Sequence, residues 1–576
     1  MMQKIFMFSI YFFISFNLLS QNIIKGKVVD AVSRQPLAAV LVTDSNSPFV
    51  NTTTDQNGNF ILKSGNQLLI SYIGYKAATI IIEKNEGNII VLEPAVIDLK
   101  DIVLQSKTVS KFGAISKIDL DLKPVKNTQE LLRIVPGLFI AQHAGGGKAE
   151  QIFLRGFDCD HGTDVQVSVD GLPVNMVSHA HGQGYADAHF IIPETINNID
   201  FGAGPYYTQH GNLNTAGYVA FTTFKNIAKN LIQVEVGRFN SFRTLAIIDL
   251  LKKNKDKQSA YISADFNYTN GAAINPQNFK RVNLFGKYNL SISDNTELTA
   301  SISSFKSAWN ASGQIPTRAV ENGTIDRFGS IDPTEGGNTE RHNANVILKH
   351  SLKNVGSWEN QIFYTNYKFN LYSNFTFYLN NPVNGDEINQ AENRNIFGYS
   401  SKLNHKHFFG SKTLNSTYGA GLRYDGTNNS RLSNVIQRKF LSNIKLGDIK
   451  ETNAFAFAQQ ELNIGKWAFD AGIRLDYFSF NYLDKLNTIQ QLAQQKTIIC
   501  PKLNIQYTVS PKMQVFIKTG KGFHSNDARV VVANEGKQIL PAAFGTDVGI
   551  ILKPANNILV TIAAWHLYLD QEFVYV

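Results

Sequence analysis

Residues 467–478 have the sequence WAFDAGIRLDYF, and their alternation decides the fold class. The odd-numbered positions hold Trp, Phe, Ala, Ile, Leu and Tyr, whereas Asp470, Arg474 and Asp476 lie among the even-numbered positions. Successive side chains of a strand point to opposite faces of a sheet, so this strand has one apolar face and one polar face. Such a strand suits a transmembrane barrel, whose outer face meets lipid and whose inner face meets water.

The neighbouring residues repeat this pattern. In KLNIQYTVSPKMQVFIKTG, residues 502–520, two alternating runs are joined by a tight turn at Pro511 and Lys512. Along the chain, tight turns such as 510–512 and 293–296 alternate with long polar connections such as 306–341 and 370–394. Outer-membrane barrels have this asymmetry, with short turns on the periplasmic side and long connections outside.

The number of strands sets a further expectation. Alternating apolar and polar residues predict about fourteen strands between Leu231 and His566. Barrels with a plugged lumen have about 22 strands. Residues 226–576 are therefore expected to form a partial barrel in a chain truncated at its carboxyl end. Unpaired strand edges in hydrocarbon are costly, so this form alone is not expected to insert as a working transporter.

Four segments precede this region: QIFLRGF (151–157), VSVDGLPV (167–174), TINNIDFGAGP (195–205) and NTAGYVAFTT (214–223). In order and spacing they resemble the plug domain of TonB-dependent outer-membrane receptors, and LLRIVPG (131–137) resembles the element that opens this plug. We place the plug at residues 111–225. Arg155, Gly156, Asp170 and Gly171 match the plug motifs of the family. The resemblance implies a structural role for them, with the arginine paired to acids and the glycines permitting turns.

Two smaller segments lie upstream of the plug. Residues 22–94 are expected to form a β-sandwich, and 54–60 resemble the carboxypeptidase-regulatory-like domain, a non-catalytic module placed in the periplasm. Its Asn57-Gly58 pair predicts a hairpin. Within the linker 95–110, residues 98–104 resemble a TonB box, which TonB captures by strand addition. The alternative is a strand closing the small domain. The box candidates are Asp98, Leu99, Asp101, Ile102, Val103 and Leu104.

The amino terminus indicates export. Residues 1–21 combine Lys4 with an apolar run from Ile5 to Leu19 and end in small polar residues, as a signal peptide does. The alternative, a membrane anchor, needs about 20 apolar residues and is disfavoured by the shorter run. The expected location is the outer membrane of a Gram-negative bacterium, with the amino-terminal domain in the periplasm.

Composition supports a mainly β fold and excludes one class of partner. The chain has 39 Phe and 22 Tyr, which suits strands and interfacial girdles. The net charge is +9, but Lys and Arg are scattered, so nucleic-acid binding is not expected. Cys159 and Cys500 cannot form a multi-disulfide framework, and the sequence does not decide whether they pair.

Histidines concentrate in the plug region. Imidazole and carboxylate groups together suit zinc, nickel or copper, which predicts a site for a metal ion or metal complex on the outward face of the plug. The alternative is that the histidines are hydrogen-bonding fillers between plug and barrel wall. No spacing matches a closed structural zinc site. The candidate ligands are Asp160, His161, His179, His181 and His189, joined by His524 from a connection expected on the external side.

The resemblance implies energy-coupled uptake of a scarce solute, with TonB and its energising inner-membrane complex as partners and outer-membrane lipid around the barrel. A metal ion or metal chelate is the first candidate solute, and a siderophore or an oligosaccharide is the alternative. No cofactor is expected except metal as cargo. No acid–base pair or nucleophile triad stands out, so no enzyme is predicted. Rival functions are a surface ligand-binding or signalling receptor without transport and a passive porin.

Overall fold

The structure is a computed structural model of the full chain. It describes residues 22–31, 34–38, 40–44, 47–64, 67–72, 75, 78–82, 86–92, 114–115, 129–142, 146–227, 229–251, 257–352, 355–409, 412–487, 493–510, 512–555 and 558–571. The expected signal peptide and the TonB-box candidates 98–104 lie outside these residues. The chain divides into two compact units, one formed by residues up to Val96 and one by nearly all the rest.

The amino-terminal unit is a sandwich of two sheets, as expected. The first sheet has the order β4 (Asn59–Ser64), β1 (Asn22–Asp30), β7 (Asn88–Leu92). The second sheet has the order β3 (Ser47–Thr53), β2 (Leu41–Asp44), β5 (Gln67–Ser71), β6 (Ala78–Ile81). Apolar side chains from both sheets, including Val28, Val42, Phe60 and Ile70, form its core. The alternation of buried and exposed positions along each strand therefore builds the sandwich.

The prediction of a hairpin at Asn57-Gly58 is wrong in one respect. The turn exists, since Gly58 has φ of +76° and its N–H donates to the Asp55 carbonyl at 2.9 Å. However, β3 pairs with β2 and β4 pairs with β1, so the turn carries the chain from one sheet to the other. Turn residues indicate where the chain reverses direction. Which strands pair depends on which apolar faces pack together.

The second unit begins with the plug. A short helix, α3 (Gln129–Leu132), ends within LLRIVPG, and the chain turns at Gly137, where φ is +79°. The described plug strands are β8 (Ala114–Ile115), β9 (Leu138–Ala141), β10 (Gln151–Leu154), β11 (Phe157–Asp158), β12 (Val165–Val169), β13 (Leu172–Pro173), β14 (Asn175–Met176), β15 (Tyr185–Ala186), β16 (Ile196–Ala203) and β17 (Gly217–Thr223). A turn of 3₁₀ helix, η1 (Pro193–Thr195), precedes β16.

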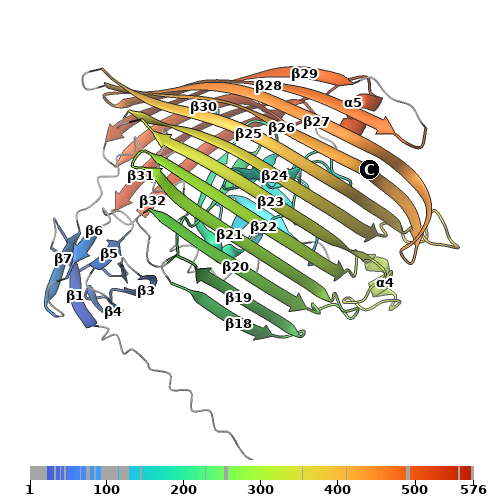
Figure 1. Ribbon diagram of the computed structural model, residues 1–576, viewed down its shortest axis with the longest axis horizontal. Helices are drawn as coiled ribbons and strands as arrows, with labels where there is room; N and C mark the ends of the chain where they lie inside the picture. Colours follow the sequence, from blue (N-terminus) through green and yellow to red (C-terminus); the bar gives the residue numbers. More distant parts are fainter. Residues whose placement is uncertain are drawn as a thin grey trace, which may run out of the picture. The chain divides into compact units, whose positions relative to one another are not determined.

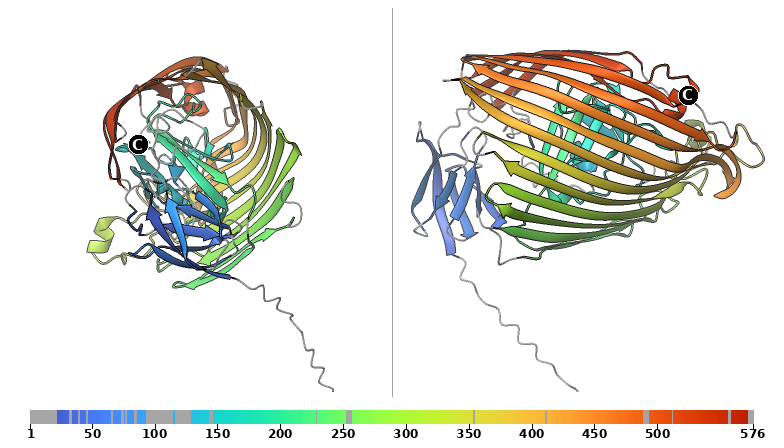
Figure 2. Two further views of the ribbon diagram at one scale, coloured as in Figure 1. Left: turned by 90° about the vertical axis from the view of Figure 1, so that its left-hand side faces the viewer. Right: turned by 45° about the horizontal axis from the view of Figure 1, so that its top comes forward.

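A 15-stranded antiparallel sheet follows, against about 14 strands expected, and β18 and β32 end its order. Figures 1 and 2 show it curving around the plug. Its strands are β18 (Leu231–Gly237), β19 (Ser241–Asp249), β20 (Gln258–Thr269), β21 (Phe279–Ser293), β22 (Thr296–Asn310), β23 (Gly336–Ser351), β24 (Gly356–Ser373), β25 (Ile388–Phe409), β26 (Lys412–Ile436), β27 (Lys439–Ile464), β28 (Trp467–Asp484), β29 (Gln494–Ser510), β30 (Met513–Phe523), β31 (Ala542–Ala555) and β32 (Ile558–Leu569).

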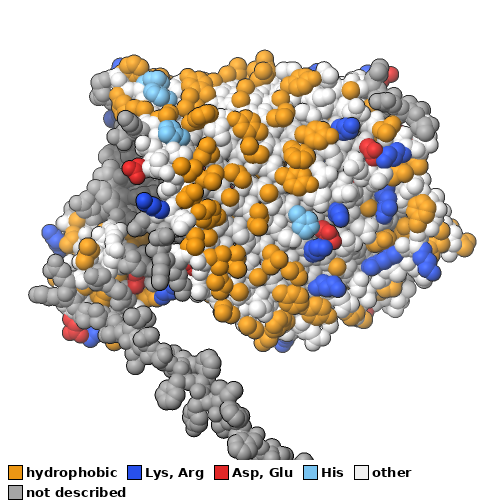
Figure 3. Space-filling model, in the orientation of Figure 1, with side chains coloured by type: hydrophobic (Ala, Val, Ile, Leu, Met, Phe, Trp, Pro, Cys, Tyr) orange, Lys and Arg blue, Asp and Glu red, His pale blue; other side chains and the backbone are white. Residues whose placement is uncertain are grey.

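The two faces of this sheet differ as the alternation predicts. In β28, Ile473 and Leu475 are exposed on the outer face, while Arg474 and Asp476 are buried on the inner face. The outer face carries many exposed apolar side chains, such as Ile302 and Ile362, and Figure 3 shows them spread over neighbouring strands. This apolar surface suits contact with hydrocarbon.

The longest connections lie at one end of the sheet, as predicted, although the β18–β19 and β26–β27 connections at that end, residues 238–240 and 437–438, are short. Their bounds differ from the expected ones, because β22 to β25 extend further than the sequence pattern suggested. The connection expected at 306–341 spans 311–335 and contains α4 (Thr317–Glu321), and the one expected at 370–394 spans 374–387. The strands continue beyond the apolar belt with polar side chains. A prediction from hydropathy alone therefore placed the strand ends too early.

The described helices are short. α5 (Ala528–Ala533) is the longest of them, and no helix in the described residues is long and apolar enough to span a membrane.

Candidate functional site

Two tight turns form the plug motifs. Arg155 and Gly156 connect the paired residues Leu154 and Phe157, and both have positive φ, +55° and +79°. Asp170 and Gly171, with φ of +46° and +77°, connect β12 to β13 in the same way. Two-residue hairpins of type I′ require positive φ at both central positions, which explains a glycine in each pair. We refer to these two turns as the hairpin tips.

Each hairpin tip directs a charged side chain at the barrel wall. Arg155 donates to both carboxylate oxygens of Asp547 in β31, at 2.8 and 2.6 Å, and the Tyr206 hydroxyl donates to the same carboxylate at 2.5 Å. Burial and the bond to Asp547 raise the pKa of Tyr206 above its ordinary value. Asp170 accepts from Lys287 in β21 at 3.1 Å. Opposite charges therefore meet at both tips, in agreement with the structural role that the resemblance implies.

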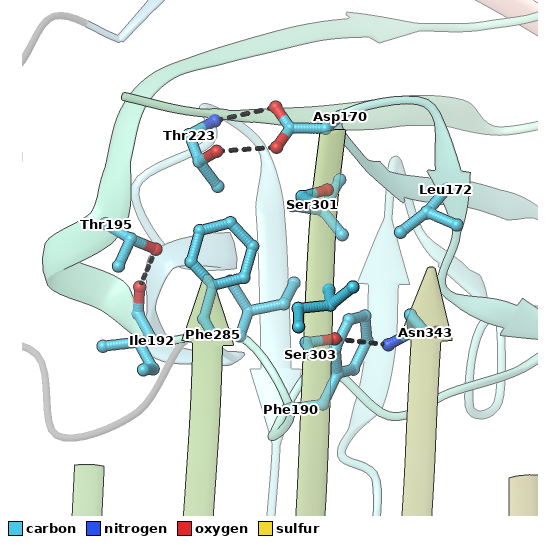
Figure 4. Close-up of a pocket in the computed structure, with 13 residues that line it drawn as sticks. Asp170, Leu172, Phe190, Ile192, Thr195, Thr223, Phe285, Ser301, Ser303 and Asn343 are labelled. Atoms are coloured by element: carbon cyan, nitrogen blue, oxygen red, sulfur yellow. Dashed lines mark hydrogen bonds between the residues drawn. The ribbon is translucent and has the colours of Figure 1, made fainter. Parts of the chain in front are cut away.

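The surroundings of Asp170 leave little space. Figure 4 shows its carboxylate accepting from the backbone N–H and hydroxyl of Thr223, at 3.0 and 2.6 Å. A cavity of about 20 Å³ lies beside it, lined by side chains that include Phe190, Ile192 and Phe285. A single water needs roughly 10–15 Å³, so this cavity is too small for a transported solute.

Three of the candidate histidines act as links within the plug or between plug and wall. His189 contacts Asp187 at 2.8 Å, and His524 contacts Asp164 of the plug at 2.8 Å. His179 lies 3.2 Å from the Tyr367 hydroxyl of β24 and stacks on Tyr185. These buried contacts match the filler role that we considered as the alternative to metal binding.

His161 and His181 form a different arrangement, which we call the histidine pair. Their Nε2 atoms lie 3.2 Å apart. His161 Nδ1 faces the Glu150 carbonyl at 3.3 Å, and His181 Nδ1 faces the Gln390 side-chain oxygen at 2.8 Å. Because both oxygens are acceptors, protons on the two Nδ1 atoms would satisfy them, and in that tautomer the two Nε2 lone pairs face one another.

The contact between the two Nε2 atoms suits either a metal ion between two lone pairs or a hydrogen bond in which one neutral ring carries its proton on Nε2. Burial, Lys148 and His161 hold the pKa of His181 well below its ordinary value, which disfavours the charged imidazolium. Burial also lowers the pKa of Lys148, to about 8. Asp160 Oδ1 lies 3.6 Å from His161 Nε2, and its side chain is 54% exposed. Within the described residues, no group of three or more His, Cys, Asp or Glu side chains is placed to hold a metal ion, so the pair would need additional ligands.

The connection that contains His524 folds inward. It lies at the end of the sheet that carries the long connections, where residues 521–532 were expected, and Ser525 and Asn526 are buried. The Gln183 side chain donates to the Ser525 carbonyl at 2.8 Å, and the Ala528 N–H donates to the Ser178 hydroxyl at 2.9 Å. This segment therefore contacts the plug loop that carries His179 and His181.

Basic side chains of the wall strands, together with Arg529 of α5, hold the plug by its backbone, a role that the sequence did not predict. Arg394 donates to the Ser178 carbonyl at 3.2 Å, Arg423 to the Asn175 carbonyl at 3.0 Å, and Arg474 to the Gln209 carbonyl at 3.1 Å. Arg341 donates to the Pro173 and Val174 carbonyls, Lys502 to the Pro205 carbonyl and Arg529 to the His179 carbonyl. We refer to all six as the wall cations.

A sequence signal could have identified several wall cations. Arg394 pairs with Glu392, Arg423 with Asp425, and Arg474 with Asp476, at 2.8, 2.6 and 2.7 Å. In each case the acid lies two residues away on the same strand, where both side chains share the inner face. An arginine and an acid at this spacing, on the polar face of a predicted strand, indicate a fixed guanidinium group.

The remaining sequence candidates are placed as follows. Cys159 and Cys500 are both buried and are not joined in a disulfide. The TonB-box candidates Asp98 to Leu104 lie outside the described residues.

Comparison with known proteins gives three matches to family descriptions. Residues 278–576 match "TonB dependent receptor-like, beta-barrel", residues 104–218 match "TonB-dependent Receptor Plug Domain", and residues 24–104 match "CarboxypepD_reg-like domain".

Solved structures with a similar fold include the ferric citrate transporter FecA, with 13% identity, a TM-score of 0.69, and 79% of this chain and 69% of that chain covered. The ferric yersiniabactin uptake receptor FyuA from Yersinia pestis has 13% identity, a TM-score of 0.62, and coverage of 81% and 73%. The copper transporter OprC has 12% identity, a TM-score of 0.59, and coverage of 78% and 70%. At these identities the likeness establishes the fold.

Proposed function

This chain belongs to the TonB-dependent receptor family, and on that premise we propose that it takes up a metal ion or metal chelate across the outer membrane by energy-coupled transport. TonB and its energising inner-membrane complex would supply the work. The ligand would bind at the end of the plug that faces the long connections, where Gln390, near the start of β25, contacts His181.

The observation that carries the choice of cargo is the histidine pair. Two nitrogen ligands about 2.0–2.1 Å from a metal in tetrahedral geometry lie roughly 3.3–3.4 Å apart. The Nε2 atoms of His161 and His181 lie 3.2 Å apart, so an ion fits between them with little movement. Histidines that bind metals commonly donate their second N–H to an oxygen, and both of these have such an oxygen beside Nδ1.

The site would remain open. Imidazole ligands suit zinc, copper, nickel and iron, and the half-exposed Asp160 could add a carboxylate oxygen. Water or a chelator would complete the coordination, which suits a cargo that must be released again. A bare ion and a small chelate are therefore both compatible with the site.

The test is a metal titration of the full chain in detergent at neutral pH. Calorimetry with Ni²⁺, Cu²⁺ and Zn²⁺ should show binding of at least one ion, and His161→Ala or His181→Ala should weaken it by about tenfold or more. His189→Gln is the matched control, because His189 lies in the plug but contacts Asp187 instead of the pair. Equal affinity in the double variant His161→Ala/His181→Ala would refute the metal proposal.

Organic cargo is the second candidate. If the double variant has no effect on metal binding, the next experiment is uptake of a ferric siderophore or an oligosaccharide by cells that carry the receptor. Binding of a ligand without accumulation in the cell would favour the surface-receptor alternative over transport.

A further inference from the structure

A second cavity lies between the plug and the inner face of β24 to β28. Its volume is about 180 Å³. Plug residues Asn175 and Val177 line one side, and wall residues Arg423, Asp425 and Glu451 line the other. A water occupies about 30 Å³ in the liquid, so the cavity has room for an ion with several waters.

Glu451 directs an unused acceptor atom into this cavity. The residue lies on the inner face of β27 and is 3% exposed. Its Oε2 accepts from the Ser178 hydroxyl at 2.7 Å, while its Oε1 has no hydrogen-bond partner among the described residues. A buried carboxylate with one unsatisfied oxygen is costly unless a cation or a proton compensates it.

The neighbouring charges do not compensate Glu451. Asp425 lies directly opposite on β26, where two like charges repel. Arg394 and Arg423 both bond to Asp425 and also to Glu392 or to plug carbonyls, whereas the hydrogen-bond partner of Glu451 among the described residues is Ser178. The charged side chains that line the cavity are two carboxylates, Asp425 and Glu451, and two guanidinium groups, Arg423 and Arg474. Arg423 is paired with Asp425 and Arg474 with Asp476, so neither is paired with Glu451.

The cavity is connected to the histidine pair through one plug segment. Asn175 and Val177 line the cavity, Ser178 bonds to Glu451, and His181 follows three residues later. Ser178 is fully buried with a positive φ of +46°. The Arg394 guanidinium and the Ala528 N–H both donate to Ser178, to its carbonyl and hydroxyl oxygens, respectively. The segment thus places the Glu451 carboxylate behind the histidine pair.

We propose that this cavity is a second cation site, in which Glu451 is the anionic ligand for a hydrated divalent cation that has passed the histidine pair. The inference rests on the proposed function, because it takes the cargo to be a metal ion. Carboxylate, amide and water oxygens bind transition metals more weakly than imidazole does. A passage needs sites that are weak enough to release the ion again, and a mostly aqueous oxygen site behind a nitrogen site meets that need.

The experiment uses Mn²⁺, which favours oxygen ligands, and follows its binding to the full chain in detergent by electron paramagnetic resonance. Wild type should bind Mn²⁺ at or below about 1 mM, as weak oxygen sites do. Glu451→Gln, which keeps the size and the bond to Ser178, should weaken this binding by about tenfold or more. Glu340→Gln is the matched control, because it removes an acid from β23 that pairs with the exposed Lys306.

The outcomes separate this inference from the proposed function. His161→Ala/His181→Ala should abolish Ni²⁺ binding at the pair and leave Mn²⁺ binding unchanged. Equal Mn²⁺ affinity in wild type and Glu451→Gln would overturn the second site, even if the pair binds Ni²⁺. Absence of Mn²⁺ binding in wild type would also overturn it, and would mean that a proton neutralises Glu451.

Discussion

The hairpin tips and the plug segment 173–183 contact the same barrel wall by opposite means. At the tips, plug side chains carry the charge: Arg155 meets Asp547, and Asp170 meets Lys287. In the segment, the plug offers backbone carbonyls and the wall supplies the charge, as Arg394 and Arg423 do. Contact at the tips depends on the identity of the plug residues, whereas contact along the segment depends on the path of the plug backbone.

This difference determines which plug side chains can be substituted without loss of a contact to the wall. A carbonyl is present at every residue, so this contact does not depend on which side chains the segment carries, and His181 lies there. The hairpin tips have no such freedom, because a changed side chain leaves a buried partner without its counter-charge. Substitutions on the two sides of each contact should therefore have unequal effects.

The largest effect is expected on the wall side of the segment. Arg394→Gln removes a guanidinium group that is fully buried and holds Glu392 and Asp425. Loss of one partner from a buried ion pair costs about 3–5 kcal/mol, so the free energy of unfolding should fall by that amount. Thermal and denaturant unfolding in detergent would measure it.

An exposed pair provides the control for Arg394. Lys225 and Glu297 lie 2.6 Å apart, but the Lys225 side chain is 62% exposed. Lys225→Ala should change stability by no more than about 1 kcal/mol. Similar losses in the two variants would show that the wall cations do not hold the plug.

The next effect concerns the Arg155 tip. Arg155→Gln leaves Asp547 with Tyr206 as its main donor and should cost about 2–3 kcal/mol, less than Arg394 because Arg155 is 15% exposed. The double variant Arg155→Gln/Asp547→Asn should recover part of the loss, since it removes both charges. A double variant less stable than the single one would contradict a direct pairing.

A smaller effect distinguishes the two tips from each other. A Cβ at Gly171 would lie 2.3 Å from the Gln361 side chain, whereas a Cβ at Gly156 would have no atom within 4 Å. Both glycines have positive φ, so Gly156→Ala should cost about 1 kcal/mol for backbone strain alone and Gly171→Ala about 2 kcal/mol. Equal losses would mean that Gln361 moves aside freely.

The smallest effect is a dependence on pH. His210 stacks on Tyr218 and contacts Gln166 at 2.8 Å, and burial with nearby Lys502 and Arg474 lowers its pKa to about 3. The folded state thus favours neutral His210, so this contribution to stability is full above the unfolded pKa of about 6.5 and is lost as the pH falls toward 3.

At pH 5.5 the loss due to His210 should be about 1 kcal/mol relative to pH 7.5. His210→Gln should reduce the acid sensitivity by that amount, which is measured as the difference between the two unfolding curves at each pH. The same pH dependence in both proteins would show that other groups cause it.

The sequence predicted the parts of this molecule that obey local rules. Alternation in 467–478 gave the correct inner and outer faces of β28, with Arg474 inside and Ile473 outside. It failed where pairing partners are distant, because the turn at Asn57-Gly58 joins two sheets.

By itself, the sequence determined the class of fold, the family and the hairpin tips, because strand alternation and Arg-Gly or Asp-Gly turns depend on neighbouring residues. Only the tertiary structure decided which histidines meet. His161 and His181 face each other through Nε2 because His181 Nδ1 faces the side-chain oxygen of Gln390, 209 residues away. The direction of a lone pair is set by the acceptor on the opposite side of the ring, and no local pattern in the sequence specifies that acceptor.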